Sequence, residues 1–133
     1  MKRTGLAFVL ATFLATSATA APPPVTSAGS MTVRTFLAKV AKLKGLGPLA
    51  IASPDLAQVK DEARAAARAL KQDADAREAA GKPPLACPPK GTKMGSGEFL
   101  TSLEAIPAAG RDIPLNQGFA LVLAKRYPCA RRP

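Results

Sequence analysis

Residues 87–129 read CPPKGTKMGSGEFLTSLEAIPAAGRDIPLNQGFALVLAKRYPC, and this stretch decides the expected fold. A cysteine closes each end, and between them apolar residues recur at helical spacing. A short helix is expected to begin with Ser96 as its N-cap and to end at Pro107. A second helix covers about residues 115–127, where Pro128 stops it. Their apolar faces are Phe99, Leu100, Leu103 and Ile106 in the first helix, and Leu115, Phe119, Val122, Leu123 and Tyr127 in the second.

The first 20 residues have the three parts of a cleaved secretory signal. A basic start is followed by an apolar run over residues 5–15, and then by a small-residue site with Ala18 at position −3 and Ala20 at position −1. The apolar run is well short of the ~20 residues that a membrane-spanning helix needs. We therefore expect cleavage between Ala20 and Ala21, export to the periplasm, and no membrane span in the mature chain.

Export determines what the two cysteines do. Both lie in the exported part, and in an oxidising compartment an even number of cysteines usually forms disulfides. With two cysteines there is one connectivity, Cys87–Cys129, and its ring would contribute roughly 4 kcal/mol in the chain-entropy model. A reactive or metal-binding thiol pair is not expected, because the sequence has no CxxC spacing and no histidine.

Upstream of the ring the sequence predicts a leader and one amphipathic helix. Residues 21–30 (APPPVTSAGS) are rich in Pro, Ser and Gly, and we expect a disordered leader there. The helix covers about residues 32–44, with Gly45 in the left-handed conformation that ends it. After a turn at residues 47–48, the apolar residues 49–51 are expected to pack onto the core.

A longer helix follows, with Ser53 as N-cap and Pro54 in its first turn, running to about Ala80 and ending at Gly81. Its predicted core face is thin and consists of Leu56, Val59, Ala63, Ala66, Leu70 and Ala74. Its opposite, solvent-facing side is predicted to carry Lys60, Arg64, Arg68, Lys71 and acidic residues. Since no strand-like alternation of useful length occurs, the expected fold is an all-α, four-helix domain over residues 31–129.

The charge of the chain limits its partners. Removing residues 1–20 takes away Lys2 and Arg3 and no acid, which leaves 17 basic and 9 acidic residues and a formal net charge of +8. Such a charge attracts acidic proteins, polyanions and anionic membrane surfaces. Nucleic acid is not an expected partner, because the basic residues are scattered and no aromatic–basic recognition motif is present.

The sequence also lacks the usual components of an enzyme. Without histidine there is no Ser–His or Cys–His nucleophile system and no His-based metal site. Asp73 and Asp75 lack the glycine and the closing glutamate of a calcium loop. Residues 91–93 lack the spacing of a phosphate-binding loop. We therefore expect a non-enzymatic protein with no catalytic, cofactor-binding or metal-binding residues.

The ring also carries a resemblance to a known family. Its entry Cys87-Pro88-Pro89-Lys90-Gly91, its apolar positions and its ending Tyr127-Pro128-Cys129 resemble the Rap/Tai group of type VI secretion immunity proteins. The match covers 43 residues, a third of the chain, and the two cysteines match residue by residue with a structural role. The resemblance implies a small periplasmic helical protein that binds and blocks a peptidoglycan amidase delivered by another cell.

Two other functions stay open at the level of the sequence. One is a small periplasmic helical chaperone or stress protein, which would expose apolar surface under stress. The other is a basic envelope module that binds anionic lipid or polysaccharide. The apolar faces of four short helices make a small core, which is also compatible with a homodimer.

Overall fold

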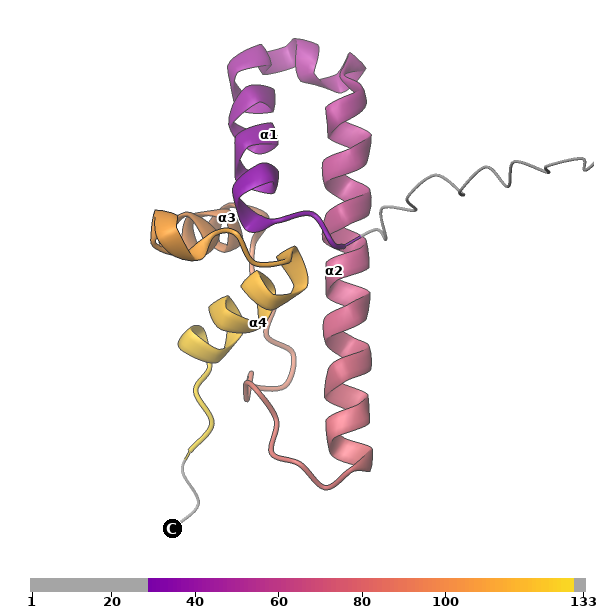
Figure 1. The fold of residues 1–133 in the computed structure, drawn as a ribbon, viewed down its shortest axis with the longest axis vertical. Helices are drawn as coiled ribbons and strands as arrows, with labels where there is room; N and C mark the ends of the chain where they lie inside the picture. The colour runs from indigo at the N-terminus through magenta and orange to yellow at the C-terminus, as the bar shows by residue number, and fades with distance from the viewer. Residues whose placement is uncertain (1–28, 131–133) are drawn as a thin grey trace, which may run out of the picture.

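The computed structural model describes residues 29–130, which form four α-helices and two short 3₁₀ segments joined by irregular connections (Figure 1). The elements are α1 (Val33–Leu46), η1 (Gly47–Ala52), α2 (Pro54–Ala79), α3 (Ser96–Glu104), η2 (Ala108–Gly110) and α4 (Leu115–Arg126). No strand occurs within residues 29–130. The predicted all-α, four-helix fold is confirmed. The predicted signal over residues 1–20 and its Ala20–Ala21 cleavage site lie outside the described residues.

The helices α1 and α2 form an antiparallel hairpin that η1 closes at one end (Figure 1). At 26 residues, α2 is about 39 Å long and extends beyond α4. The helices α3 and α4 lie beside the open half of the hairpin. Within residues 29–130 no helix is long and apolar enough to cross a membrane.

The start of α1 agrees with the prediction, but its end does not. The hydroxyl of Thr32 accepts a hydrogen bond from the backbone N–H of Thr35 and caps the helix. The helix continues through Gly45, which stays helical, and stops at Gly47 with φ of +54°. The prediction of Gly45 as the stop is therefore wrong. Pro48 explains the difference, because a proline disfavours the helical conformation at the residue before it.

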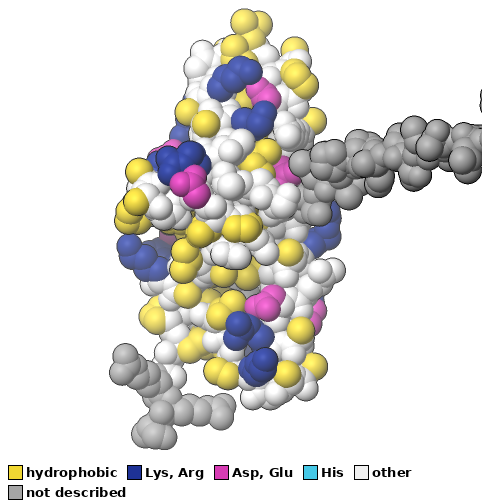
Figure 2. All heavy atoms as spheres, viewed as in Figure 1, with side chains coloured by type: hydrophobic (Ala, Val, Ile, Leu, Met, Phe, Trp, Pro, Cys, Tyr) yellow, Lys and Arg dark blue, Asp and Glu magenta, His cyan; other side chains and the backbone are white. Residues whose placement is uncertain are grey.

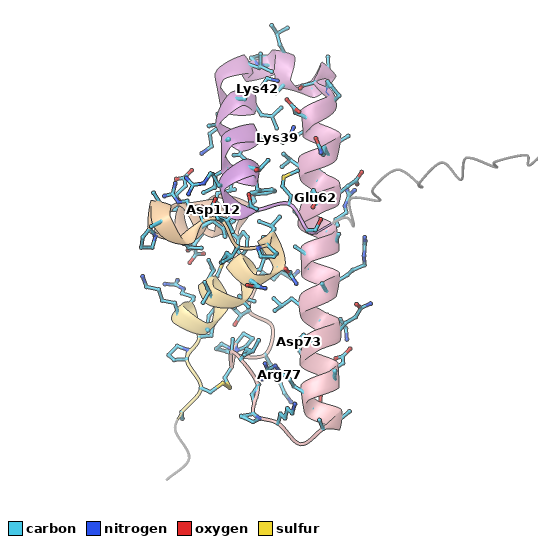
Figure 3. All side chains as sticks on the ribbon, viewed as in Figure 1. Lys39, Lys42, Glu62, Asp73, Arg77 and Asp112 are labelled. Atoms are coloured by element: carbon cyan, nitrogen blue, oxygen red, sulfur yellow. A yellow bond between two sulfur atoms is a disulfide. The ribbon has the colours of Figure 1, made fainter. Side chains whose placement is uncertain are left out.

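The start of α2 is as predicted. Ser53 accepts a hydrogen bond from the backbone N–H of Asp55, Pro54 is the first helical residue, and Gly81 follows the helix with φ of +66°. From α1, Lys39 and Lys42 each place their Nζ 2.7 Å from a carboxylate oxygen of Asp55 (Figure 3). These hydrogen bonds lower the pKa of Asp55 to about 2, and the bond from Lys39 has the larger effect. The two helices are thus fixed to each other at the closed end of the hairpin.

The core lies where α1 meets α3 and α4. The predicted apolar faces supply it, and its buried residues are Val33, Phe36, Leu37, Val40, Ala66, Leu103, Leu115, Phe119 and Val122. Phe99 of α3 meets Phe119 of α4 edge to face, with ring centroids 4.3 Å apart. Gly118 lets α4 approach α1 closely, because a Cβ at this position would overlap the side chain of Val33. The core is small, and most of it belongs to α1 and α4.

Helix α3 begins one residue earlier than predicted and also ends earlier. Its N-cap is Gly95, and Ser96 is the first helical residue, so the prediction of Ser96 as the cap is wrong. The helix stops at Glu104, and Pro107 disfavours the helical conformation at Ile106, directly before it. The guanidinium of Arg111 donates hydrogen bonds to the carbonyl oxygens of Glu104 and Ile106, which satisfies the end of this helix.

The predicted Cys87–Cys129 disulfide is present and joins the α2–α3 connection to the end of α4. The backbone N–H of Cys87 also donates to the carbonyl of Tyr127 over 2.8 Å, so the two segments are paired by backbone as well. Cys87 is exposed and Cys129 is half-buried. The pair holds the long connection over residues 80–95 against the rest of the domain.

The chain enters the fold across α2, at Glu62. The backbone N–H groups of Gly29 and Met31 both donate to one carboxylate oxygen of Glu62. Gly29 is buried against Ala65 and Ala66 with φ of +93°. Gly29, in the predicted leader over residues 21–30, is therefore packed on α2, Ser30 after it is exposed, and residues 21–28 lie outside the described part. Glu62, which the sequence placed with the solvent-facing acids, is buried with 8% of its surface exposed.

Ion pairs connect the remaining elements. Arg34 of α1 donates two hydrogen bonds to the carboxylate of Asp112, at 2.6 and 2.9 Å, and a third to the carbonyl of Ala108. The hydrogen bond from Arg34 lowers the pKa of Asp112 and raises that of Arg34. Two further pairs run from α1 to α3 (Lys44–Glu104) and from α4 to α3 (Arg126–Glu98). Each is exposed and adds a modest contribution to stability.

Candidate functional site

The closed end of the α1–α2 hairpin carries large apolar side chains in solvent. Leu49 is 74% exposed and Ile51 is 83% exposed, and Leu46 beside them is 36% exposed. We call these three residues the apolar tip. Figure 2 shows hydrophobic side chains at this end of the molecule, beyond the level of the other helices. The prediction that residues 49–51 pack onto the core is wrong, because the core lies at the opposite end of α1, near α3 and α4.

The base of the apolar tip is held firmly. The two lysine bonds to Asp55 tie α1 to α2 directly below it, and the carboxylate they bind is 14% exposed. The backbone N–H of Ser53 donates to the carbonyl of Ala50 over 3.0 Å and closes the 3₁₀ segment. Pro48 fixes the backbone at the beginning of that segment. The tip therefore presents its two most exposed side chains, Leu49 and Ile51, on a well-defined backbone.

Cationic side chains flank the tip on one side. A shallow hollow of about 300 Å³ lies next to Ile51, and α2 lines it with two cations, Lys60 and Arg64, and one acid, Asp61. Arg64 also binds Asp61 over 3.2 Å. Large exposed aliphatic residues on a protruding surface commonly mark a contact with a partner. Here the complementary surface would be an apolar pocket with an acidic rim.

A second feature is an open apolar groove of about 650 Å³ on the side of α2 that faces the other helices. All four helices contribute to it: Phe36 and Val40 from α1, Phe99 from α3, Phe119 from α4, and a row of residues along α2. The row on α2 is Val59, Lys60, Ala63, Ala67, Leu70, Lys71 and Ala74. Lys60 and Lys71 are exposed, as predicted, and they also border the groove. Ala74, which was predicted on the core face, is exposed, so that prediction is wrong.

The alanines of α2 are the feature of the sequence that marks this groove. Small residues on a predicted core face indicate that another helix packs closely against them. Ala66 is such a position, because it is fully buried. Around Ala63 and Ala67, the small side chains instead leave space that the neighbouring helices do not fill. Whether an alanine gives close packing or open space depends on where the partner helix crosses, which the helix's own sequence does not specify.

In the second half of α2 the acidic side chains pair with basic residues of the same helix and form no cluster for chemistry. Asp73 forms an ion pair with Arg77 over 2.9 Å (Figure 3), and Asp75 forms one with Lys71 over 2.7 Å, so each aspartate pairs with a different basic residue. Within residues 29–130 no group of three or more Cys, Asp or Glu side chains could hold a metal ion. Of the residues singled out from the sequence, Cys87 and Cys129 are brought together, and their role is structural.

Comparisons with protein-family models, with curated proteins and with solved structures give no significant match to this chain. The resemblance of residues 87–129 to the Rap/Tai group therefore stays a prediction from the sequence. The candidate sites are those that the geometry itself provides: the apolar tip and the apolar groove.

Proposed function

We propose that this protein is a non-enzymatic periplasmic binding protein of the immunity type, which blocks a peptidoglycan amidase by placing its apolar tip in the enzyme. The observation that carries the proposal is the exposure of Leu49 and Ile51 on a firmly held backbone. Blocking an enzyme in this way requires a protruding surface and no catalytic group of its own.

The energy available at the tip is sufficient for a specific contact. Burying one large aliphatic side chain that was exposed contributes about 1.5–3 kcal/mol. Two adjacent aliphatic residues therefore form the kind of compact centre that dominates many protein interfaces. The backbone needs little ordering on binding, because Asp55 and Ser53 already hold it.

Charge and compartment support the choice of partner. Lys60 and Arg64 beside the tip favour an enzyme whose cleft has an acidic rim, and the mature chain carries an excess of basic residues overall. The signal-like N-terminus supports a periplasmic location, where a peptidoglycan amidase acts. The resemblance of the Cys87–Cys129 ring to type VI immunity proteins supports an amidase as the class of partner.

A protection experiment tests this proposal. Bacteria that produce a type VI amidase effector in their periplasm are made to co-produce the full chain, and survival is counted for a panel of such effectors. We expect protection against at least one effector from the wild type and its loss in the double variant Leu49→Glu/Ile51→Glu. Leu121→Glu is the matched control, because Leu121 is 54% exposed on α4, away from the tip. No protection by the wild type, or equal protection by the tip variant at equal protein level, would refute the proposal.

The apolar tip with its flanking cations also favours a second function, that of a basic module which binds anionic membrane surfaces. In that case the purified chain binds vesicles of phosphatidylglycerol but not of phosphatidylcholine, and added salt weakens the binding. The double variant at the tip would reduce it. Equal binding to both kinds of vesicle, or to neither, would exclude this second function.

A further inference from the structure

The apolar groove has the size and lining of a ligand site. Its volume of about 650 Å³ falls within the ~300–1,000 Å³ typical of small-molecule pockets. Phe36, Phe99 and Phe119 form an aromatic part of the lining, and Met94 from the α2–α3 connection adds an adaptable side chain. The groove is open to solvent along α2, so a ligand can enter without any movement of the backbone.

The groove is long enough for one hydrocarbon chain. Its residues on α2 extend from Val59 to Ala74, which corresponds to about 22 Å along the helix axis. A single acyl chain spans half of a bilayer's ~30 Å hydrocarbon core, about 15 Å. A bound chain would therefore fit lengthwise, with space for a head group at one end.

The charges at the groove indicate the sign of that head group. The two ionisable residues of its lining are Lys60 and Lys71, and no Asp or Glu is part of the lining. Lys71 is engaged by Asp75 over 2.7 Å, whereas Lys60 makes no ion pair with the residues that the structure describes. An anionic group near Lys60 could form an ion pair with its ammonium group, whereas at Lys71 it would have to displace the carboxylate of Asp75.

We propose that the groove binds a single-chain anionic amphiphile, with the chain along the alanine row of α2 and the head group at Lys60. This site lies along α2 away from Leu49 and Ile51, shares Lys60 with the hollow beside the apolar tip, and adds a ligand to the proposed function. The shared chemistry is one acyl chain with a negative head group, which a free fatty acid or a lysophospholipid could supply.

Binding of cis-parinaric acid, a fluorescent fatty acid, to the purified mature chain tests the site. We expect saturable binding that palmitate and lysophosphatidylglycerol displace, and that hexadecanol and lysophosphatidylcholine displace less effectively. If palmitate alone displaces the probe, the head group is a carboxylate, and if both displace it, a phosphate is accepted too; both results support the proposal. No saturable binding, or displacement by hexadecanol as strong as by palmitate, would overturn it.

Two pairs of variants locate the ligand. Ala67→Trp fills the groove and should weaken binding at least about tenfold, whereas Ala76→Trp, exposed on α2 outside the groove, should leave it unchanged. Lys60→Gln should weaken the binding of palmitate by about twofold to fivefold, and Arg68→Gln on the same helix should leave it unchanged. Circular dichroism confirms that each variant folds. Equal effects within either pair would overturn the assignment. The assay contains no amidase, so its result is independent of the proposed function.

Discussion

Replacing Gly118 by alanine should destabilise this domain, although alanine is the better helix former. Gly118 lies in α4 and is buried where the helix crosses the start of α1. A Cβ here would overlap Cγ2 of Val33 and would contact Leu103 at 3.5 Å. Val33 is fully buried and β-branched, so its side chain has little freedom to turn away.

The magnitude follows from two opposing effects. Alanine in place of glycine within a helix gains about 1 kcal/mol. Overpacking of a well-filled core costs about 1–3 kcal/mol, and a stiff, buried neighbour puts Gly118→Ala near the upper end. We expect a net loss of about 1–2 kcal/mol in the free energy of unfolding, and a fall in Tm of about 5–10 °C.

Thermal and guanidinium unfolding followed by circular dichroism measure both values. Gly45→Ala is the matched control, because Gly45 is also helical and a Cβ there meets nothing within 4 Å. This control should stabilise the protein by about 0.5 kcal/mol. In the double variant Val33→Ala/Gly118→Ala the clash is removed, so the two changes should couple favourably by about 1 kcal/mol or more. If Gly118→Ala stabilises the protein as Gly45→Ala does, the close α1–α4 crossing is not real.

Three further perturbations test the contacts that hold the domain. Replacing Cys87 and Cys129 by serine opens a ring with a sequence separation of 42 and should lower the free energy of unfolding by about 4 kcal/mol, measured by guanidinium unfolding. Because the folded pKa of Asp55 is about 2, below its ordinary 3.8, its stabilising effect is complete above the ordinary value and is lost as the pH falls towards 2. Acid unfolding of Asp55→Asn should therefore depend less on pH in that window, and an unchanged profile would contradict the pairing. Glu62→Ala leaves the buried N–H of Gly29 without its acceptor and should cost about 1–3 kcal/mol, with faster amide exchange at Gly29.

The helices and their buried faces could be predicted from the sequence because they depend on local patterns. Phe99, Leu103, Phe119 and Val122 recur at helical spacing, and all four belong to the core or pack against it. Ser53 and Pro54 mark the start of α2 by local chemistry alone. The disulfide could be predicted from the number of cysteines and from the predicted signal, without any knowledge of the fold.

Features that depend on how the helices are placed in space could not be predicted. Glu62 carries a charge and was assigned to solvent, but the incoming chain at Gly29 covers it. Leu49 and Ile51 are apolar and were assigned to the core, yet the hairpin extends beyond the helices that could have covered them. The candidate sites arise from such placements, so hydropathy alone is misleading at these residues.

Titration of the purified mature chain into a type VI amidase acting on isolated peptidoglycan tests the central claim most directly. The effector is the one selected by the protection experiment, and the inhibition constant is measured for the wild type, Leu49→Glu/Ile51→Glu and Leu121→Glu. If the apolar tip is the binding surface, the inhibition constant of the double variant should be about 100-fold or more above that of the wild type. The Leu121→Glu control should stay within about twofold of the wild type. Inhibition that is equally strong with the double variant, or absent with the wild type, would contradict it.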